Sequence, residues 1–340
     1  FMWFGTWDGI NRFDGHNFII YKSKPGDTSS LRNNRIDNIV EDRSGYLWLK
    51  AYDNQIYRFD KKKEQFLAIS DQLHTPGNTK FVFEDIILSA NGPIWLQTKN
   101  QGIFYVPDPG AAHLRFYRYA NGLGNGFNLP SNNITFFYED AQRLVWVGTP
   151  NGISCLKKNA AGTYINVKLD QAFSRGYNFT SVAENKDMIW LGTSNGYLVL
   201  YKKATGQFIS KKVSANQLNG IRVSKKRNAA YLSTSGGEII TIDPASLSIS
   251  SSSRMAGAPA LYSIYEDRSG LLWIEPEKHG VIKYDPYKQT FKHFTQRNDA
   301  NYENLAKYYN VFEDKDGVVW TNMKGEGFGY YDPATDKVNY

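Results

Sequence analysis

The sequence predicts an all-β protein, a β-propeller built from four-stranded blades. A Trp-centred segment recurs along the whole chain at a period of roughly 40 to 50 residues, and each period has room for four short strands. Aromatic residues make up 15% of the chain, and it contains 29 glycines. Aromatic residues favour strands and glycine supplies the turns between them. Four strands in a repeat of this length are typical of a propeller blade.

The clearest copies of the repeat share an acidic pair, a tight turn and a tryptophan strand. They read IVEDRSGYLWL at 39–49, IYEDRSGLLWI at 264–274, VFEDKDGVVW at 311–320 and YEDAQRLVWVGT at 138–149. Weaker copies lie at 90–96, 185–193 and 228–234, and the chain opens inside a further copy. The aromatic anchors of the repeat are therefore Trp3, Trp48, Trp95, Trp146, Trp190, Tyr231, Trp273 and Trp320.

Each copy predicts the same four strands in order. An apolar strand ends in Glu-Asp, an Asp-x-x-Gly turn follows, and the Trp strand ends in Gly-Thr or a related pair. A second glycine opens the third strand, as at 152–156 and 280–284, and a variable turn leads to the fourth, as at 290–294. The tryptophans are expected to pack between neighbouring blades, because one blade cannot bury both of its faces. Since the Glu-Asp pairs recur in register, we interpret them as structural and not as acid–base pairs.

The ends of the repeat series define the predicted domain organisation. Copy 1 lacks its first strand, and copy 8 has three strands and the start of a fourth. We predict a single β-propeller domain over residues 1–340, with seven blades favoured over eight. Residues from about 305 to 340 are then either the closing blade or the start of a second propeller.

Composition excludes several classes of protein. The single cysteine, Cys155, excludes a disulfide framework within the chain, and no stretch approaches the length of an apolar membrane helix. The net charge is +7, but the basic runs at 61–63, 211–212 and 225–227 are short. We interpret them as solvated loop charge and predict no nucleic-acid contact by this domain.

Catalytic and metal-binding patterns are not apparent in the sequence. The five histidines (His16, His74, His113, His279 and His293) are not at metal-ligand spacing, so no metal, cofactor or catalytic residue is predicted. Cys155 lies inside a strand with no base indicated nearby. His279 departs from the repeat, because other copies carry Gly-Thr-x-x-Gly in that segment.

The loops after the Trp strands carry the candidate ligand-binding residues. Every copy enters and leaves in the same direction, so these loops should emerge on one face. Aromatic rings there can stack on sugar faces while short polar side chains bind hydroxyls. The candidates are Trp7, Asp8, Tyr52, Asp53, Lys99, Asn151, Asn195, His279 and Lys324, with Trp7 and Tyr52 the strongest. Alternatively, Trp7 packs at a blade interface or on another domain, or the face binds a protein partner.

Residues 1–15, FMWFGTWDGINRFDG, resemble the opening repeat of the two-component-regulator propellers, and the Glu-Asp-Arg-Ser-Gly-x-Leu-Trp segments resemble later repeats of that family. The resemblance covers nearly the whole chain. It is weakest in copy 6, where Tyr231 replaces tryptophan and the Glu-Asp pair is missing. These propellers form the periplasmic sensor region of hybrid two-component systems in Bacteroides-type bacteria. Usually two seven-bladed propellers precede a β-sandwich, a membrane helix and a histidine kinase.

The resemblance implies that this chain is the first propeller of a larger, periplasmic sensor and is not itself an enzyme. The implied ligand is an oligosaccharide or polysaccharide. The implied partners are the second propeller, the β-sandwich and the kinase, with a homodimer in the full protein. Two alternatives remain open at this point: a protein-interaction or dimerisation propeller, and a polysaccharide-acting or lyase-type propeller enzyme.

Overall fold

The chain folds into two compact units of antiparallel β-sheet, Phe1–Leu169 and Asp170–Tyr340. The computed structural model describes residues 1–73, 80–123, 128–255, 260–277, 280–294, 311–323 and 327–339. Within these residues the helical elements are single turns, the 3₁₀ turn η1 (Ile69–Gln72) and the helix α1 (Gln171–Ser174).

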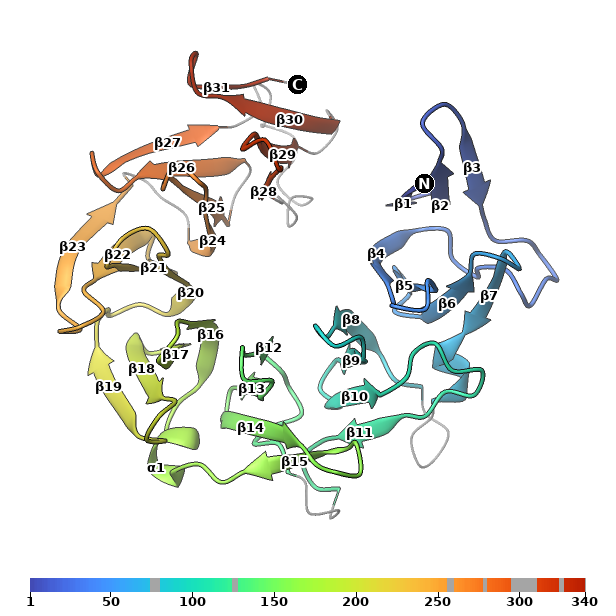
Figure 1. The fold of residues 1–340 in the computed structure, drawn as a ribbon, viewed down its shortest axis with the longest axis horizontal. Helices are drawn as coiled ribbons and strands as arrows, with labels where there is room; N and C mark the ends of the chain where they lie inside the picture. Colours follow the sequence, from blue (N-terminus) through green and yellow to red (C-terminus); the bar gives the residue numbers. More distant parts are fainter. Residues whose placement is uncertain are drawn as a thin grey trace. The chain divides into compact units, whose positions relative to one another are not determined.

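The first unit contains four sheets, drawn from blue to green in Figure 1. Their strands are β1 (Met2–Thr6), β2 (Gly9–Phe13) and β3 (Phe18–Tyr21); β4 (Ile36–Glu41), β5 (Leu47–Ala51), β6 (Ile56–Asp60) and β7 (Gln65–Ala68); β8 (Phe83–Leu88), β9 (Ile94–Thr98), β10 (Ile103–Val106) and β11 (Tyr117–Tyr119); β12 (Phe136–Glu139), β13 (Val145–Thr149), β14 (Gly152–Lys158) and β15 (Tyr164–Val167).

The second unit contains a further four sheets, each with four strands. The strands are β16 (Phe179–Glu184), β17 (Met188–Thr193), β18 (Tyr197–Lys202) and β19 (Phe208–Lys212); β20 (Leu218–Val223), β21 (Ala230–Thr234), β22 (Glu238–Ile242) and β23 (Ile249–Arg254); β24 (Leu261–Glu266), β25 (Leu272–Pro276), β26 (Val281–Asp285) and β27 (Thr290–Phe294); β28 (Val311–Glu313), β29 (Val319–Met323), β30 (Gly327–Asp332) and β31 (Lys337–Asn339).

Strands that are consecutive in sequence are neighbours in every described sheet, which is the meander of a propeller blade. The predicted class, an all-β β-propeller of four-stranded blades, is confirmed. The described residues form eight sheets, the first with three strands and the other seven with four. Trp3 lies in β1, so β1 is the second strand of its repeat and the first strand is the one not present. The last sheet has its fourth strand, β31.

The turn between the first and second strands is built by the aspartate of the Glu-Asp pair. Asp42 Oδ1 accepts the backbone N–H groups of Ser44 and Tyr46 at 2.9 and 3.0 Å. Its Oδ2 accepts the indole N–H of Trp48 at 2.9 Å. The same indole contact joins Asp140 to Trp146, Asp267 to Trp273 and Asp314 to Trp320. The aspartate therefore orients the turn and the anchor together.

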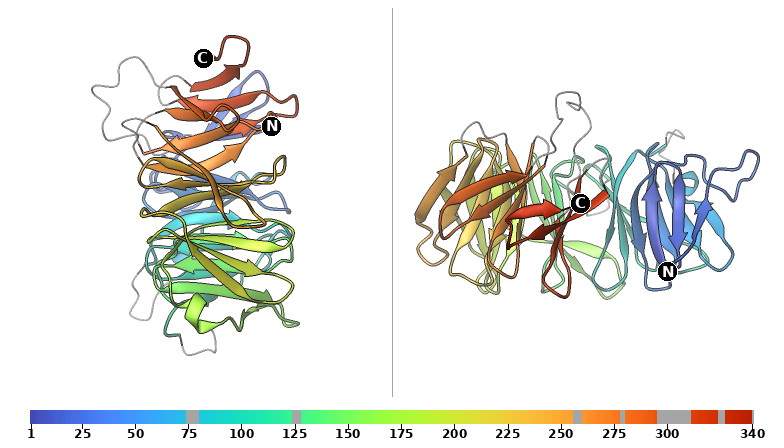
Figure 2. Two further views of the ribbon diagram at one scale, coloured as in Figure 1. Left: turned by 90° about the vertical axis from the view of Figure 1, so that its left-hand side faces the viewer. Right: turned by 90° about the horizontal axis from the view of Figure 1, so that it is seen from above.

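The anchor aromatic side chains form the cores between successive sheets of a unit. Trp48 packs with Phe83, Leu96 and Phe104 of the following sheet, and Trp190 packs in the same way with residues of β20 to β22. Figure 2 shows these neighbouring sheets stacked face to face within each unit. Five of the anchor tryptophans are at most 1% exposed, so the periodic aromatic residues of the sequence are buried in the core.

The glutamates of the Glu-Asp pairs bind the sheet that precedes their own. Glu313 accepts the backbone N–H of Arg268 at 3.1 Å, and Glu139 accepts that of Ala90 at 3.2 Å. These contacts tie the turn of one sheet to the next sheet. They agree with the structural interpretation of the acidic pairs.

Candidate ligand-binding site

The candidate residues lie between the second and third strands of their sheets. The β1–β2 loop carries Trp7 and Asp8, β5–β6 carries Tyr52 and Asp53, β9–β10 carries Lys99, β13–β14 carries Asn151 and β17–β18 carries Asn195. His279 and Lys324 lie outside the described residues.

A threonine at the end of the second strand fixes the shape of these loops. Its hydroxyl donates to a backbone oxygen across the loop, from Thr6 at 2.9 Å, from Thr149 at 2.8 Å and from Thr193 at 2.9 Å. The following residue is Trp7 in one loop and Ser194 in another. The fold therefore specifies the threonine and leaves the side chain after it free to serve another purpose.

Arg35 joins the two strongest candidates, Trp7 and Tyr52. The Arg35 Cζ atom lies 4.7 Å from the centroid of the Trp7 ring and 3.9 Å from that of Tyr52. Trp7 is 68% exposed and Tyr52 is 56% exposed. Cation–π contacts at such exposed positions contribute about 0.5–1 kcal/mol each. We call these three residues the Trp7–Arg35–Tyr52 cluster.

Neighbouring groups hold Arg35 in place. The backbone N–H of Tyr52 donates to the Arg35 carbonyl oxygen at 2.9 Å. Arg35 Nε donates to Asp37 Oδ1 at 3.2 Å, and Lys50 Nζ lies 3.1 Å from Asp37 Oδ2. The two Nη groups of Arg35 make no hydrogen bond within the described ranges. The guanidinium is thus held by the Nε hydrogen bond to Asp37 and by the two aromatic rings, and its Nη groups can donate hydrogen bonds to a ligand.

The cluster combines the chemical groups that saccharide recognition uses. Exposed aromatic rings stack on the apolar faces of sugars, and a planar guanidinium donates two parallel hydrogen bonds to paired oxygens. Asp8 forms an ion pair with Lys22 beside Trp7. Asp53 Oδ1 accepts the N–H of Gln55 at 3.3 Å and so stabilises its own loop.

The remaining candidates are not joined to the cluster by any contact among the described residues. The N–H of Lys99 donates to the Val82 carbonyl at 2.8 Å, and that of Asn151 donates to Thr149 Oγ1 at 3.3 Å. Asn195 belongs to the second unit, where its Oδ1 accepts the Thr193 hydroxyl at 2.8 Å. The ligand-binding roles of all these residues stay predictions.

The sequence analysis missed Arg35, Asp37 and Lys50. Arg35 precedes β4 in a segment where the repeat imposes no pattern, so only the folded chain brings it to Trp7 and Tyr52. Lys50 could have been found, because it stands two residues after Trp48, where other copies carry Gly148 and Gly192. A charged residue where other copies of a repeat carry glycine indicates that its charge is needed in that one sheet.

Groups suited to catalysis are dispersed in the described part of the chain. It holds no set of three His, Cys, Asp or Glu side chains placed to bind a metal ion. Cys155 lies in β14 and is buried, and burial raises the pKa of its thiol. His16 lies in an exposed turn, where its backbone N–H donates to Asp14 Oδ1 at 2.8 Å.

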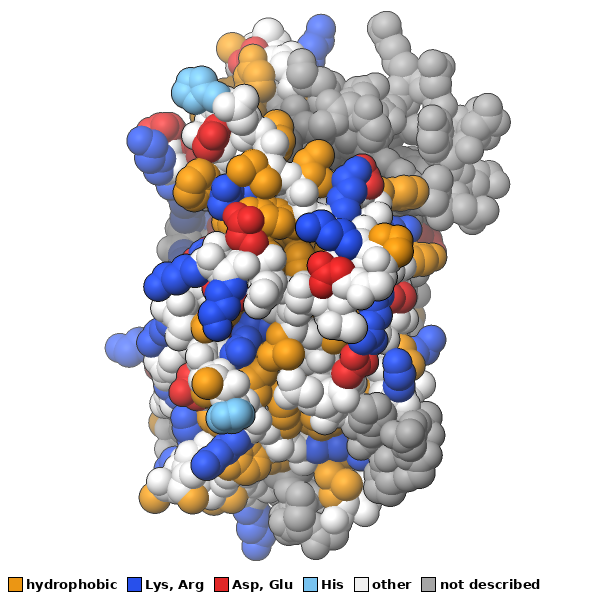
Figure 3. Space-filling model, turned by 90° about the vertical axis from the view of Figure 1, so that its right-hand side faces the viewer, with side chains coloured by type: hydrophobic (Ala, Val, Ile, Leu, Met, Phe, Trp, Pro, Cys, Tyr) orange, Lys and Arg blue, Asp and Glu red, His pale blue; other side chains and the backbone are white. Residues whose placement is uncertain are grey.

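Basic side chains do not merge into a single patch on the face drawn in Figure 3. Lys and Arg there are interspersed with Asp, Glu and apolar side chains. Several basic side chains of the described residues are paired, as in Lys61 with Glu41 at 2.5 Å and Arg12 with Glu64 at 3.4 Å. Neither helix of the described residues is long and apolar enough to cross a membrane.

Comparison with solved structures shows first the class of protein. A virginiamycin B lyase from Staphylococcus aureus is 15% identical, with a TM-score of 0.56 over 87% of this chain and 94% of the lyase. Extracellular domains from B. thetaiotaomicron, assigned to a one component and to a hybrid two component system, are each 16% identical over 99% of this chain. Their TM-scores are 0.43 and 0.42, and this chain spans 58% and 52% of their lengths. At these identities the similarity shows the propeller fold alone.

The sequence then identifies the repeat. Residues 128–151 match the family described as two component regulator propeller. This segment contains the Tyr138–Trp146 copy and its Asp140–Trp146 contact. The chain therefore carries a two-component-regulator propeller repeat, as the sequence predicted. No curated protein matches the chain.

Proposed function

We propose that this chain is the ligand-sensing propeller of a hybrid two-component signalling protein and binds an oligosaccharide or polysaccharide at the Trp7–Arg35–Tyr52 cluster. The observation that carries the proposal is the partly buried Arg35 in contact with two exposed aromatic rings. Such a cluster contributes little to the stability of the fold, because exposed aromatic rings forgo the favourable free energy of apolar burial. A ligand that covers the rings would recover that free energy.

The wider setting of the proposal comes from the propeller repeat. We place the chain in the periplasm, in the extracytoplasmic part of an inner-membrane protein that dimerises and carries a second propeller, a β-sandwich and a kinase. Ligand binding here would be relayed to the kinase, and this domain would perform no catalysis. The interpretation of residues 1–340 as one propeller, with the part beyond about 305 closing it or opening a second, stays a prediction.

The test is a thermal-shift screen of the purified chain against neutral and acidic oligosaccharides, with product release followed in the same wells. A ligand that binds only the native state raises Tm, by an amount equivalent to about 2.7 kcal/mol at one hundred times Kd. We expect one glycan class to raise Tm without turnover. Trp7→Ala and Tyr52→Ala should each abolish the shift.

Tyr287→Ala is the matched control. Tyr287 is 73% exposed and lies over Arg227, with 3.1 Å between the guanidinium Cζ and the ring centroid, but it is in the second unit. The control should keep the glycan shift. Turnover of a glycan would favour the lyase-type or polysaccharide-acting enzyme instead, and a shift that survives both substitutions would remove the cluster from the proposal.

A further inference from the structure

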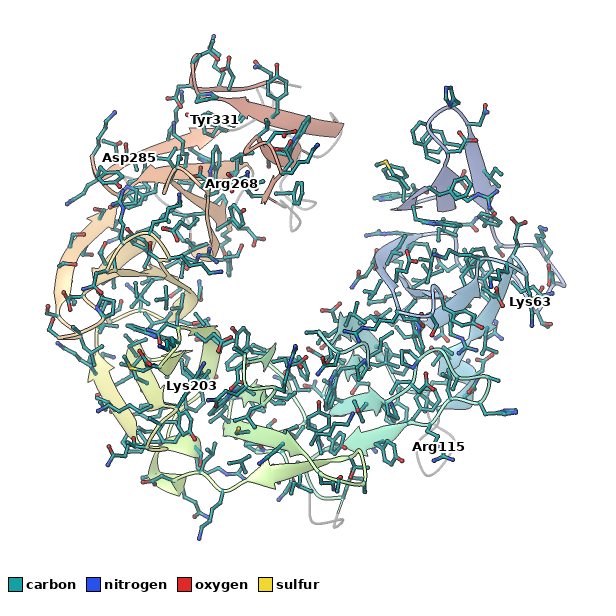
Figure 4. The ribbon with its side chains drawn as sticks, in the orientation of Figure 1. Lys63, Arg115, Lys203, Arg268, Asp285 and Tyr331 are labelled. Atoms are coloured by element: carbon teal, nitrogen blue, oxygen red, sulfur yellow. The ribbon has the colours of Figure 1, made fainter. Side chains whose placement is uncertain are left out.

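A pocket of about 500 Å³ lies in the second unit, between the sheets β24–β27 and β28–β31. Its polar lining includes Lys283, Lys288, Lys292, Tyr331 and Asp336. In Figure 4 the labelled Asp285 and Tyr331, which also line it, mark the two neighbouring sheets. The residues cluster where third strands turn into fourth strands. This is the opposite end of the blade from the loops that carry the candidates above.

Part of this pocket is a structural contact that recurs. In three sheets the third strand carries a basic residue opposite the anchor, and this residue reaches the connection between the third and fourth strands of the following sheet. Arg12 Nη1 lies 3.4 Å from Glu64 Oε1, and Arg58 Nη1 donates to the Pro109 carbonyl at 2.9 Å. Lys283 occupies the same position and pairs with Asp336. The pairing of Lys283 with Asp336 thus belongs to the fold.

Two further lysines line the pocket, of which Lys288 holds the turn position of Lys63 and Lys292 has no counterpart in the first two sheets. Lys292 is paired in register with Lys283, whereas Ile19 and Leu67 hold the same position opposite Arg12 and Arg58. Lys292 Nζ lies 2.8 Å from Asp336 Oδ2. Lys288 is exposed, and its ammonium group makes no hydrogen bond or ion pair with the residues that the structure describes.

The two carboxylates of the pocket already accept hydrogen bonds from groups of the protein. Asp336 accepts from Lys283, Lys292 and the Tyr331 hydroxyl, the last at 2.8 Å. Partial burial would raise the pKa of Asp336, but these hydrogen bonds outweigh it and hold the pKa well below its ordinary value. Asp285 Oδ1 accepts two backbone N–H groups of its own turn, those of Tyr287 and Lys288. Three ammonium groups therefore face two carboxylates, which leaves an excess of positive charge.

We propose that this pocket binds an anionic oxygen group, a sulfate or carboxylate, with Lys288 and Lys292 as its ligands. Charge-assisted hydrogen bonds from ammonium groups are the strong contacts for such a group. Phe291 and Pro333 add apolar surface to the lining, which suits a group carried on a sugar ring. The anion comes either as a free ion or as a substituent of a saccharide. The proposal does not depend on the Trp7–Arg35–Tyr52 cluster.

The experiment has one arm for each source of the anion. The purified chain is titrated calorimetrically with a sulfated disaccharide and with its unsulfated counterpart. Its Tm is also measured in sodium sulfate and in sodium chloride at equal ionic strength. Because sulfate stabilises proteins generally by exclusion from their surface, only the difference between wild type and variant counts. We expect Lys288→Gln/Lys292→Gln to weaken anion binding roughly tenfold or more.

Lys62→Gln/Lys63→Gln, in the corresponding β6–β7 turn, is the matched control and should bind as wild type does. Lys288→Gln alone removes an ammonium group without a partner in the described residues, so it tests binding even if the double variant is unstable. Loss of the sulfate effect indicates a free ion, and loss confined to the sulfated disaccharide indicates a saccharide substituent. Equal binding by wild type and variants, or no anion binding by wild type, would overturn the proposal. Trp7→Ala should leave this binding unchanged.

Discussion

The position two residues after each anchor shows how a single residue can depart from a repeat. Glycine occupies it in three sheets, as Gly5, Gly148 and Gly192, and at the last two a Cβ would meet the Phe136 ring and Ser181 Oγ, both at 2.2 Å. In the sheet β24–β27 the residue is Glu275, half-buried, and its carboxylate accepts the Ser263 hydroxyl at 2.8 Å. Burial raises the pKa of Glu275, and the Ser263 hydrogen bond only partly opposes this. Burial therefore disfavours the ionised form of Glu275 in the folded state.

The pKa shift of Glu275 predicts a pH-dependent effect of Glu275→Gln. The unfolded chain titrates near the ordinary value of 4.5 and the folded chain at a higher pH. Stability associated with this group is therefore present at low pH and is lost as pH rises through the folded pKa. We expect the glutamine variant to melt on the order of 1–2 °C above wild type at pH 7 and together with it near pH 4.

Calorimetric melting curves between these pH values make the measurement. Glu277→Gln changes an exposed neighbour of the same type and should give no pH-dependent difference. A stabilisation by Glu275→Gln that stays constant with pH would show that desolvation of the charge is not the cause.

At the scale of the element, the turn between the first and second strands departs from the Asp-x-x-Gly pattern in the sheet β16–β19. The turn before β17 is shorter by one residue, and Asn185 stands where other copies have aspartate. Asn185 Oδ1 accepts the N–H groups of Asp187 and Met188 at 3.0 and 2.8 Å. The Trp190 indole N–H, however, is buried and has no partner among the described residues. An amide offers one acceptor oxygen, whereas a carboxylate offers two.

We predict that Asn185→Asp stabilises the protein, because its second oxygen can accept the Trp190 indole N–H. A satisfied buried hydrogen bond contributes about 1 kcal/mol. The reverse change, Asp140→Asn, removes the acceptor of Trp146 and should destabilise by about 1–3 kcal/mol. Denaturant unfolding of the two variants measures both effects. If Asn185→Asp leaves the unfolding midpoint unchanged, the shorter turn does not bring the carboxylate to the indole.

At the scale of the whole molecule, one buried thiol reports on opening of the sheets. Cys155 is 1% exposed and lies in β14, between β13 and β15. A thiol reacts as its thiolate, and burial both hides the sulfur and raises its pKa. We predict that a disulfide reagent at pH 8 labels the native chain only as fast as the chain opens, whereas the chain in denaturant reacts at once.

The labelling rate should rise with denaturant in parallel with loss of tryptophan fluorescence. Cys155→Ala with Thr205→Cys, which moves the thiol to an exposed turn, provides the control and should react immediately in native buffer. Rapid labelling of native Cys155 would mean that its sheet opens locally without global unfolding.

The predictable part of the fold is the part whose contacts are short in sequence. The Asp42–Trp48 hydrogen bond spans 6 residues, as do its counterparts at Asp140, Asp267 and Asp314. In these four sheets the turn and the place of the anchor follow from it, so the repeat predicted the blades. The loop position of Trp7 follows in the same way from Thr6, and Tyr52 holds the same position after Ala51 in the next copy.

The sequence by itself determined that this protein is a β-propeller of four-stranded blades that carries a two-component-regulator repeat at 128–151, because the turn and anchor contacts recur along the chain. Only the tertiary structure decided that Arg35 lies between Trp7 and Tyr52 and that Lys292 joins Lys283 on Asp336. Those last contacts span 44 and 53 residues. Their partners come from different sheets, so no pattern within one repeat encodes them, and the packing of one sheet on the next creates both candidate sites.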